Sequence, residues 1–307
     1  MKKILVIGAS GFVGSYIVEE LLTKGYTVHC LARNPTKLKS LADKGCKIFQ
    51  GDILDPVSLQ KATDSVDAVY ISIHTLSPQS GNEKDMNFAD VELEGIQNII
   101  SACKTNGVKR VIYVTFLGST SDSDNAWIRG RWDAEQLLFH SGLDATVIGP
   151  GMIVGIGGQG YDSIVNNAKK GVAFILGFGK QKFSNIAITD LTYYLVGILN
   201  DSRSYGQRYD VGGDEILTTP QMIDIVAEIL GRRHPKKIYI PVFPIRFLAS
   251  VIERMSKMPK GAIKSLINSL KSDVCGDTNP IKRILPRPLL TFRQASKQAL
   301  KRQINID

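Results

Sequence analysis

The chain has 307 residues, of which 43% are hydrophobic and 22% charged, and these proportions are ordinary for a globular protein. This length is enough for one complete α/β domain and a smaller additional part. The four cysteines are scattered without a Cys-x-x-Cys pair, which argues against a metal site or a disulfide framework and predicts a reducing compartment. No apolar stretch is long enough to span a bilayer, and the short apolar run after Met1 lacks the features of a signal peptide, so we expect a cytoplasmic protein.

The net charge of +9 is unevenly distributed along the chain. Residues 231–307 hold 17 Lys and Arg against 4 Asp and Glu, whereas residues 1–230 hold 21 basic and 25 acidic residues. Such an asymmetry marks an anionic partner, such as a membrane surface, or is only a solvated face of the protein. No nucleic-acid-binding module accompanies the basic residues, so we do not expect nucleic acid as a partner.

The first motif combines an apolar run from Ile4 with three glycines, Gly8, Gly11 and Gly14. An amphipathic run at helical spacing, Phe12 to Leu22, follows directly. A strand, a tight turn and a helix N-terminus in this order form a site for a pyrophosphate, because the glycines allow close backbone approach and the helix offers free N–H groups. The motif therefore predicts a dinucleotide-binding site; the alternative is a plain glycine-rich turn.

A second strand, Tyr26 to Leu31, ends at Ala32-Arg33-Asn34-Pro35, where a dinucleotide fold selects its cofactor. A carboxylate at this place would bind the ribose hydroxyls, but the sequence has Arg33, whose guanidinium suits a 2′-phosphate. We therefore expect NADP, with NAD as the less favoured cofactor. The alternative is that Arg33 is an ordinary surface arginine.

Two further strands end in polar residues that are candidates for cofactor contact. After the strand Cys46 to Gln50, Asp52 is placed to accept a hydrogen bond from an adenine amino group, and Asp55 is expected to cap a helix that begins at Pro56. The buried strand Val66 to Ile73 stops at His74, and residues 77–85 are expected to form a loop. Because ligands bind at the carboxyl ends of such strands, Ile73 and His74 are expected near the cofactor.

Helices and strands continue to alternate as far as Gly151. The pattern predicts helices and strands in turn, over residues 86–105, 109–115, 125–140 and 144–148. Alternation of this kind predicts an α/β fold with a Rossmann-type, doubly wound parallel sheet. We divide the chain into a dinucleotide-binding core of residues 1–155 and a smaller, mainly helical substrate or lid region of residues 156–307, with the chain crossing back to the core near residues 183–211.

A basic amphipathic segment is expected in the C-terminal region, over residues 241–258. Its apolar residues fall on one helical face: Phe247, Leu248, Val251, Ile252 and Met255. Its basic residues fall toward the other: Arg246, Arg254 and Lys257. Such a stripe is usually part of a core, but with basic surroundings it could instead rest on an anionic membrane.

The combined motifs resemble the extended and atypical short-chain dehydrogenases, and in particular the NmrA-like NAD(P)-binding proteins. The matching segments are residues 8–14, 33–35, 51–55, 107–115 and 150–155, and the resemblance covers roughly residues 1–230 in order. It implies that the pyrophosphate is contacted by Gly8, Ser10, Gly11, Phe12 and Val13. It implies contacts of Arg33 with the 2′-phosphate, of Asp52 and Ile53 with the adenine, and of Ile73 and His74 with the far side of the nicotinamide ribose. The nicotinamide amide would lie beside Pro150, Gly151, Met152 and Ile153.

The chain departs from this family at the positions of its proton-transfer residues. Active enzymes use a Tyr-x-x-x-Lys pair, but here Trp127 stands at the tyrosine position and Arg131 at the lysine position. An indole N–H does not transfer protons near pH 7, and Arg131 could bind a ribose or phosphate but stays protonated. Just past the fifth strand, Phe116 and Leu117 stand where this family has a serine, and of these positions only the neighbouring Thr115 keeps a hydroxyl. Thr115, Trp127 and Arg131 therefore form a degenerate catalytic set, with His74, Arg129 and Tyr161 as further polar candidates.

Three functional interpretations follow from these residues. The first is an NAD(P)H-dependent oxidoreductase of atypical mechanism, acting on a small or lipid-like molecule. The second is a non-catalytic redox sensor, regulator or assembly factor that binds NADP(H) and a protein partner. The third is a protein that associates with an anionic membrane through its basic C-terminal region.

Overall fold

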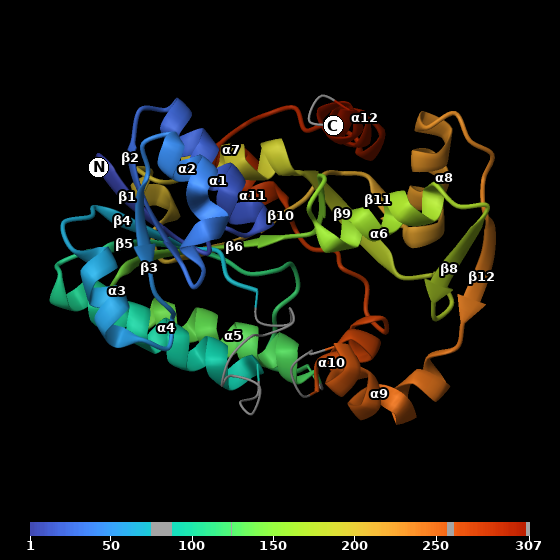
Figure 1. Ribbon diagram of the computed structural model, residues 1–307, viewed down its shortest axis with the longest axis horizontal. Coiled ribbons are helices and arrows are strands. Elements are labelled where there is room, and N and C mark those ends of the chain that lie inside the picture. The colour runs from blue at the N-terminus through green and yellow to red at the C-terminus, as the bar shows by residue number, and fades with distance from the viewer. Residues whose placement is uncertain (75–87, 124, 257–260, 305–307) are drawn as a thin grey trace.

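A single parallel sheet of seven strands forms the centre of the protein (Figure 1). The computed structural model describes residues 1–74, 88–123, 125–256 and 261–304. The strand order is β10-β6-β5-β4-β1-β2-β3, and every neighbouring pair is parallel. These strands are β1 (Lys3–Ile7), β2 (Thr27–Ala32), β3 (Lys47–Gln50), β4 (Ala68–Ile71), β5 (Arg110–Val114), β6 (Asp144–Pro150) and β10 (Gln207–Val211). The predicted Rossmann-type, doubly wound sheet is confirmed.

Helices cover both faces of this sheet (Figure 1). On one face lie α1 (Phe12–Thr23), α2 (Lys39–Asp43), α7 (Ile188–Gly197) and α11 (Asn279–Ile284), and the short 3₁₀ helix η1 (Pro35–Leu38) precedes α2. On the other lie α3 (Pro56–Thr63), α4 (Phe88–Thr105) and α5 (Ala126–Phe139). Each layer buries its own apolar cluster against the sheet. The loop that we expected over residues 77–85 lies outside the described residues.

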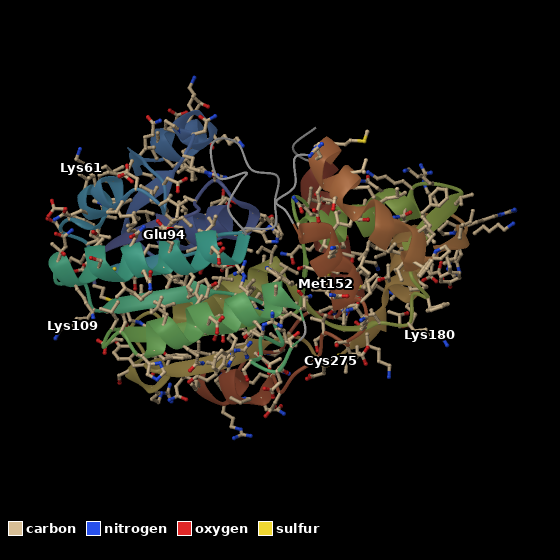
Figure 2. The ribbon with its side chains drawn as sticks, turned by 90° about the horizontal axis from the view of Figure 1, so that it is seen from below. Lys61, Glu94, Lys109, Met152, Lys180 and Cys275 are labelled. Carbon is tan, nitrogen blue, oxygen red and sulfur yellow. The ribbon has the colours of Figure 1, made fainter. Side chains whose placement is uncertain are left out.

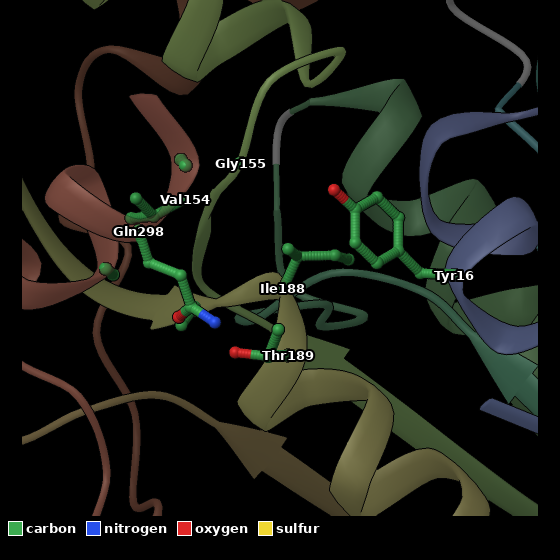
Figure 3. Close-up of a pocket in the computed structure, with 9 residues that line it drawn as sticks. Tyr16, Val154, Gly155, Ile188, Thr189 and Gln298 are labelled. Atoms are coloured by element: carbon green, nitrogen blue, oxygen red, sulfur yellow. The ribbon is translucent and has the colours of Figure 1, made fainter. Parts of the chain in front are cut away.

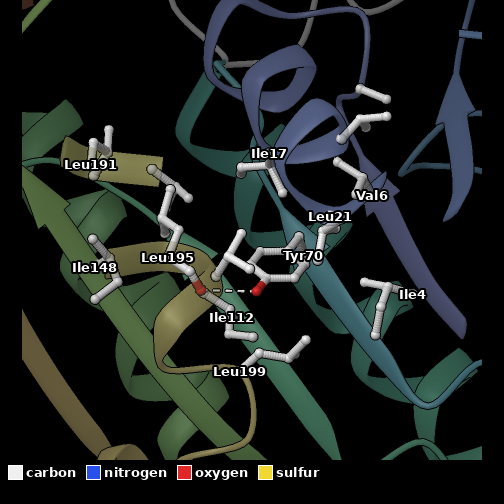
Figure 4. Close-up of a cluster of buried hydrophobic side chains, with 14 of the residues drawn as sticks. Ile4, Val6, Ile17, Leu21, Tyr70, Ile112, Ile148, Leu191, Leu195 and Leu199 are labelled. Carbon is white, nitrogen blue, oxygen red and sulfur yellow. Dashed lines mark hydrogen bonds between the residues drawn. The ribbon is translucent and has the colours of Figure 1, made fainter. Parts of the chain in front are cut away.

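Buried polar side chains attach α7 to the sheet. In the cluster of Figure 4, the Tyr70 hydroxyl on β4 donates to the Leu195 carbonyl at 2.8 Å. Arg110 on β5 is 1% exposed, and its guanidinium donates to the carbonyls of Ile198 and Leu199, just past the end of α7, at 2.9 and 3.0 Å. Carbonyls at a helix C-terminus have no partner within the helix, so a buried arginine satisfies them. Burial lowers the pKa of Arg110.

The turn between β1 and α1 depends on two glycines. Gly8 has a φ of +83°, and a Cβ at this residue would lie 2.1 Å from the carbonyl oxygen of Ser72. A Cβ at Gly14 would lie 2.2 Å from the carbonyl oxygen of Gly8. The first position therefore allows the strand to turn beside the end of β4, and the second allows the helix to pack closely against the turn.

After β7 the chain contributes again to the central sheet, because β10 pairs with β6 and α7 packs on α1. The C-terminal part is not only helical. A three-stranded sheet has the order β11-β9-β7, and β12 pairs with β8 in a two-stranded parallel sheet. These strands, which the sequence pattern did not reveal, are β7 (Met152–Val154), β8 (Val172–Leu176), β9 (Lys182–Ala187), β11 (Ile216–Thr218) and β12 (Lys236–Ile240).

The remaining helices form two groups (Figure 1). One group packs around a third apolar cluster and comprises α6 (Gln159–Ala168), α8 (Thr219–Ile229) and α12 (Phe292–Ile304). The other is a helical hairpin of α9 (Val242–Ser256) and α10 (Ala262–Ser269). A 3₁₀ helix, η3 (Ser202–Ser204), precedes β10. In the part of the chain that the structure describes, no helix has both the length and the apolarity needed to cross a membrane.

Candidate functional site

The residues that we predicted to bind a cofactor follow the carboxyl ends of six neighbouring strands. Residues 8–13 follow β1, Arg33 follows β2, residues 52–53 follow β3, residues 73–74 follow β4, and Thr115 follows β5. Pro150 ends β6, and Gly151 leads into β7. Because parallel strands end at the same edge of a sheet, the fold places all of these residues along one edge. In Figure 2, Met152 lies between the sheet and the C-terminal part.

The N-terminus of α1 has the features of a phosphate site. Its N-cap is Gly11, no side chain caps the helix, and the first turn contains no acidic residue. Ser10 and Gly11 are exposed, while Phe12 and Val13 are half-buried. The ring of Phe12 lies so close to Gly155 that a Cβ there would approach it to 2.8 Å. Backbone N–H groups and the positive end of the helix dipole are therefore available to an anion.

Arg33 and Asp52, which we predicted at the adenosine end of the cofactor, lie next to each other. The Arg33 Nε atom is 3.8 Å from Asp52 Oδ2, and 49% of the Arg33 side chain is exposed. Asp52 Oδ1 accepts the backbone N–H of Leu54 at 2.8 Å, so its orientation is fixed by the loop. At 3.8 Å, with the Arg33 side chain half exposed, this ion pair contributes little to stability.

Ile53 is held in place by α4. A Cβ at Gly95 would lie 2.4 Å from Ile53 Cδ1, so only a glycine lets the side chain approach the helix this closely. The Ile53 carbonyl accepts a hydrogen bond from Asn98 Nδ2 at 3.0 Å. The apolar surface predicted to meet the adenine is thus rigidly supported.

Arg131 on α5 is part of a buried network that the sequence did not reveal. Its Nη1 atom lies 3.0 Å from Glu92 Oε1 on α4, and the two side chains are 2% and 1% exposed. The same nitrogen donates to the Tyr113 hydroxyl at 3.1 Å, and Nη2 donates to the Ile73 carbonyl at 3.3 Å. The Tyr113 hydroxyl in turn donates to Glu92. Arg131 is therefore held between the ends of β4 and β5, beside the predicted ribose contacts.

The charges in this network make it unsuited to proton transfer near neutral pH. Burial raises the pKa of Tyr113 well above its usual range, although the positive charge of Arg131 opposes this shift. Burial disfavours the charge on Arg131, but Glu92 and Tyr113 outweigh it and raise the pKa of this guanidinium. Loss of solvation by the surrounding protein is the main effect that lowers the pKa of His74, to about 4, and the positive charge of Arg131 adds to it, although His74 remains exposed. We infer that His74 is neutral at pH 7.

Trp127 is fixed by an aromatic stack and by the helical hairpin. Its ring stacks on Phe116 with centroids 4.4 Å apart, and the guanidinium carbon of Arg131 lies 5.8 Å from the Trp127 ring. Ala262 of α10 packs against the same indole. Within the described part of the chain, the Trp127 Nε1 and Thr115 Oγ1 atoms are buried without a hydrogen-bond partner. Buried polar atoms of this kind are candidates for contact with a bound molecule.

A second ion pair, between the half-buried Arg208 and the buried Glu135, positions Phe116. Arg208 on β10 donates from Nη2 to the Phe116 carbonyl at 3.1 Å, and its Nε atom lies 2.8 Å from Glu135 Oε2 on α5. Glu135 is one helical turn after Arg131, and it also accepts from the Ser119 hydroxyl at 2.5 Å. Glu92, Glu135 and Arg208 are thus functional candidates that sequence reasoning missed, because the partners of each pair lie on different elements.

Several predicted residues lie outside this network. Arg129 is exposed and donates to the Ser123 carbonyl, and Tyr161 is buried in the core of the C-terminal part, in edge contact with Phe292. A separate small pocket lies between α1, the start of α7 and α12, and Figure 3 shows Tyr16, Thr189 and Gln298 in its lining. This pocket borders the phosphate cradle through Gly155, which also contacts Phe12.

Comparison with known proteins agrees with this geometry. A family model described as NAD(P)H-binding matches residues 8–174, more than half of the chain. An NAD(P)H azoreductase of Xenophilus azovorans is 24% identical over 306 residues, which cover 96% of each chain. The photosystem II assembly factor Ycf39 of Cyanophora paradoxa is 35% identical over 144 residues, 47% of this chain and 43% of that protein.

Among solved structures, an NADPH-dependent quinone oxidoreductase of Escherichia coli in complex with NADPH superposes with a TM-score of 0.73 and 19% identity, over 97% of this chain and 99% of that one. At this identity the likeness concerns the fold alone. The glycine cradle on β1 and α1, the strand order and the match of the family model together assign the chain to the NAD(P)H-binding, NmrA-like branch of the atypical short-chain dehydrogenases.

Proposed function

We propose that the protein binds NADP(H) and reduces a conjugated, electron-poor acceptor without a protein-borne proton donor. One observation carries this proposal: the N-terminus of α1 forms an open phosphate cradle beside a site that lacks the family's usual acid pair. In that site Trp127 stands at the tyrosine position, and Arg131, at the lysine position, is buried and paired with Glu92. The cradle supports cofactor binding, and the altered pair limits the chemistry that can follow.

The residues at the sheet edge fit an NADP molecule. The uncapped first turn of α1 would hold the pyrophosphate through backbone N–H groups. Arg33 would bind the 2′-phosphate, leaving its 3.8 Å contact with Asp52, and Ile53 would support the adenine. At the other end, Arg131 and the Ile73 carbonyl lie where the nicotinamide ribose is expected, and the partnerless Thr115 hydroxyl supplies a donor beside it.

The lack of a suitable proton donor in the site limits which substrates it can reduce. The bound nicotinamide would supply a hydride. Tyr113 and Arg131 hold their protons too tightly to serve as acids, and His74 is a neutral imidazole at pH 7, which is too weak an acid to donate its N–H proton. An acceptor such as a quinone or an azo compound delocalises the negative charge that hydride addition creates, so water can deliver the proton. A simple ketone would require an acid beside its oxygen. The stacked rings of Trp127 and Phe116 offer an apolar wall to such a flat acceptor.

Cofactor titration tests the first half of this proposal. The purified protein is titrated with NADPH and NADH, and Arg33→Asp is compared with Lys37→Asp, which changes an exposed cation nearby. Loss of a charge-assisted contact with the 2′-phosphate is expected to weaken NADPH binding by about 10- to 100-fold. NADH binding should change little, and Lys37→Asp should keep most of the preference. Equal affinity of the wild type for both cofactors would refute the role of Arg33.

The second candidate function is a non-catalytic NADP(H)-binding sensor or assembly factor. The locked Arg131–Glu92 pair favours it, since a cofactor cradle without an acid keeps the ability to bind while losing the usual chemistry. The similarity to an assembly factor is consistent with this role. Steady oxidation of NADPH with a quinone or azo dye, lost in Arg33→Asp at limiting NADPH, would support the reductase. Tight NADPH binding without turnover over such a panel would favour the sensor.

A further inference from the structure

The outer face of α9 combines exposed apolar side chains with positive charge. Leu248, Val251 and Met255, which we call the hairpin patch, are 54%, 56% and 81% exposed. They are spaced three and four residues apart, so they form one stripe along the helix. Ala249 and Glu253, on the opposite side of α9, are 1% and 6% exposed, because that side packs on α10. Three residues of the predicted stripe thus face solvent, whereas Ile252 is half-buried and the Phe247 side chain lies outside the described residues.

The segment that contains the hairpin patch carries charge almost entirely of one sign. Residues 236–271 contain eight Lys and Arg but one acidic residue, Glu253. That carboxylate is buried and accepts the backbone N–H of Ile263 at 2.9 Å, so it adds no negative charge to the surface. Arg254, directly before Met255, and Lys264 on α10 are both exposed. Arg254 therefore places a cation beside the patch, and Lys264 adds an exposed cation on the other helix of the hairpin.

We propose that the α9–α10 hairpin seats the protein on an anionic membrane surface, with the hairpin patch in the interface and the basic residues against lipid phosphates. An amphipathic helix with an apolar stripe and cationic borders binds lipid by burying the stripe while its charges meet anionic headgroups. Of the net charge of +9, residues 236–271 contribute +7 (8 basic, 1 acidic) and the rest of the chain only +2 (30 basic, 28 acidic), so the hairpin segment is favoured as the point of contact with an anionic surface. Figure 1 shows α9 and α10 at the periphery, away from the central sheet.

The hairpin also touches the candidate site. The Asn125 Nδ2 atom, at the start of α5, donates to the Ser265 carbonyl on α10 at 2.8 Å, and Ala262 packs on Trp127. A hairpin seated on lipid would therefore hold the Trp127 end of α5 close to the membrane. The docking proposal does not depend on the proposed function, because it rests on the exposed stripe and its charge alone.

Vesicle co-sedimentation tests the role of the hairpin patch. The full chain is mixed, at low salt, with vesicles of phosphatidylcholine alone or of phosphatidylcholine with phosphatidylglycerol. We expect binding only to the mixed vesicles. Replacing Leu248, Val251 and Met255 together by serine should lower the partition constant more than tenfold. The matched control replaces two exposed apolar residues elsewhere, Val57 and Ile216, by serine and should bind like the wild type.

The contribution of charge is tested separately. Arg254→Glu with Lys264→Glu should weaken binding to the mixed vesicles by at least about fivefold for each cation, because one lysine near an anionic surface contributes about that factor. Lys61→Glu with Lys109→Glu, which reverses two exposed cations in the sheet domain, is the control and should change binding little. The proposal would be overturned if the wild type did not bind the mixed vesicles, or if it bound vesicles of phosphatidylcholine alone equally well. It would also be overturned if the Lys61→Glu, Lys109→Glu control lost as much binding as the Arg254→Glu, Lys264→Glu variant. So would a wild-type dimer that the serine triple variant converts to a monomer, because the patch would then join two copies of this chain.

Discussion

The buried pair of Arg131 and Glu92 provides a sharp test of the site. Glu92→Gln keeps the size of the side chain and an acceptor for the Tyr113 hydroxyl, but it removes the negative charge. Arg131, which is 2% exposed and lies 3.0 Å from Glu92, is then left as an uncompensated buried charge. Breaking such a pair typically costs about 3–5 kcal/mol of unfolding free energy.

This cost can be converted into a melting temperature. An unfolding entropy of about 2.1 cal/mol/K per residue corresponds to about 0.6 kcal/mol/K for a chain of this length, so the midpoint should fall by about 5–8 °C. Glu94→Gln, on the exposed side of the same helix, is the matched control and should change stability by less than about 0.5 kcal/mol. Circular dichroism melts at pH 7 without cofactor measure both variants.

A double variant completes the test. Arg131→Met alone should be destabilising to a similar extent, because it leaves the Glu92 carboxylate buried without its cation. Glu92→Leu combined with Arg131→Met should lie much closer to the wild type, since an apolar pair needs no compensation. If Glu92→Gln melts like Glu94→Gln, or if the losses at Glu92 and Arg131 simply add, the assignment of a coupled buried pair is wrong.

Three further predictions concern the fold around the site. Arg110→Met leaves the buried carbonyls at the end of α7 without donors and should lower the unfolding free energy by about 3–5 kcal/mol in urea denaturation; a loss below about 1 kcal/mol would contradict the capping role. Burial, and then the nearby lysines, lower the pKa of His29 below its ordinary value of 6.5, so the stability present above pH 6.5 should decrease as the pH falls below it. His29→Gln should flatten this decrease, whereas the exposed His140→Gln should not. Gly8→Ala places a Cβ against backbone at positive φ and should abolish NADPH binding or folding, and a stable variant with wild-type affinity would show that the turn can move.

The central sheet could be predicted because its strands carry a strong local signal. Strands β1 to β6 are short runs rich in apolar and β-branched residues, and the structure places them within a few residues of the predicted ranges. Asp55 accepts the Val57 N–H at 3.0 Å, as expected of an N-cap. The strands β7, β8, β9, β11 and β12 escaped prediction, because they are short, irregular in pattern and stabilised by partners far away along the chain.

The sequence by itself determined the cofactor cradle, since three glycines between an apolar strand and an amphipathic helix specify the tight turn that holds a pyrophosphate. It also determined the loss of the usual tyrosine and lysine. Only the tertiary structure decided what replaces them. Glu92 and Arg131 occupy different helices, and Arg208 reaches Glu135 and Phe116 from a strand at the sheet edge. Such pairings produce no periodic pattern in the sequence, because the paired residues belong to elements that are far apart along the chain and are buried against each other only in the fold. The stripe on α9 is another example, because its helical spacing suits a core and a membrane surface equally well. Only the packing of α10 on the opposite side of α9 leaves it exposed.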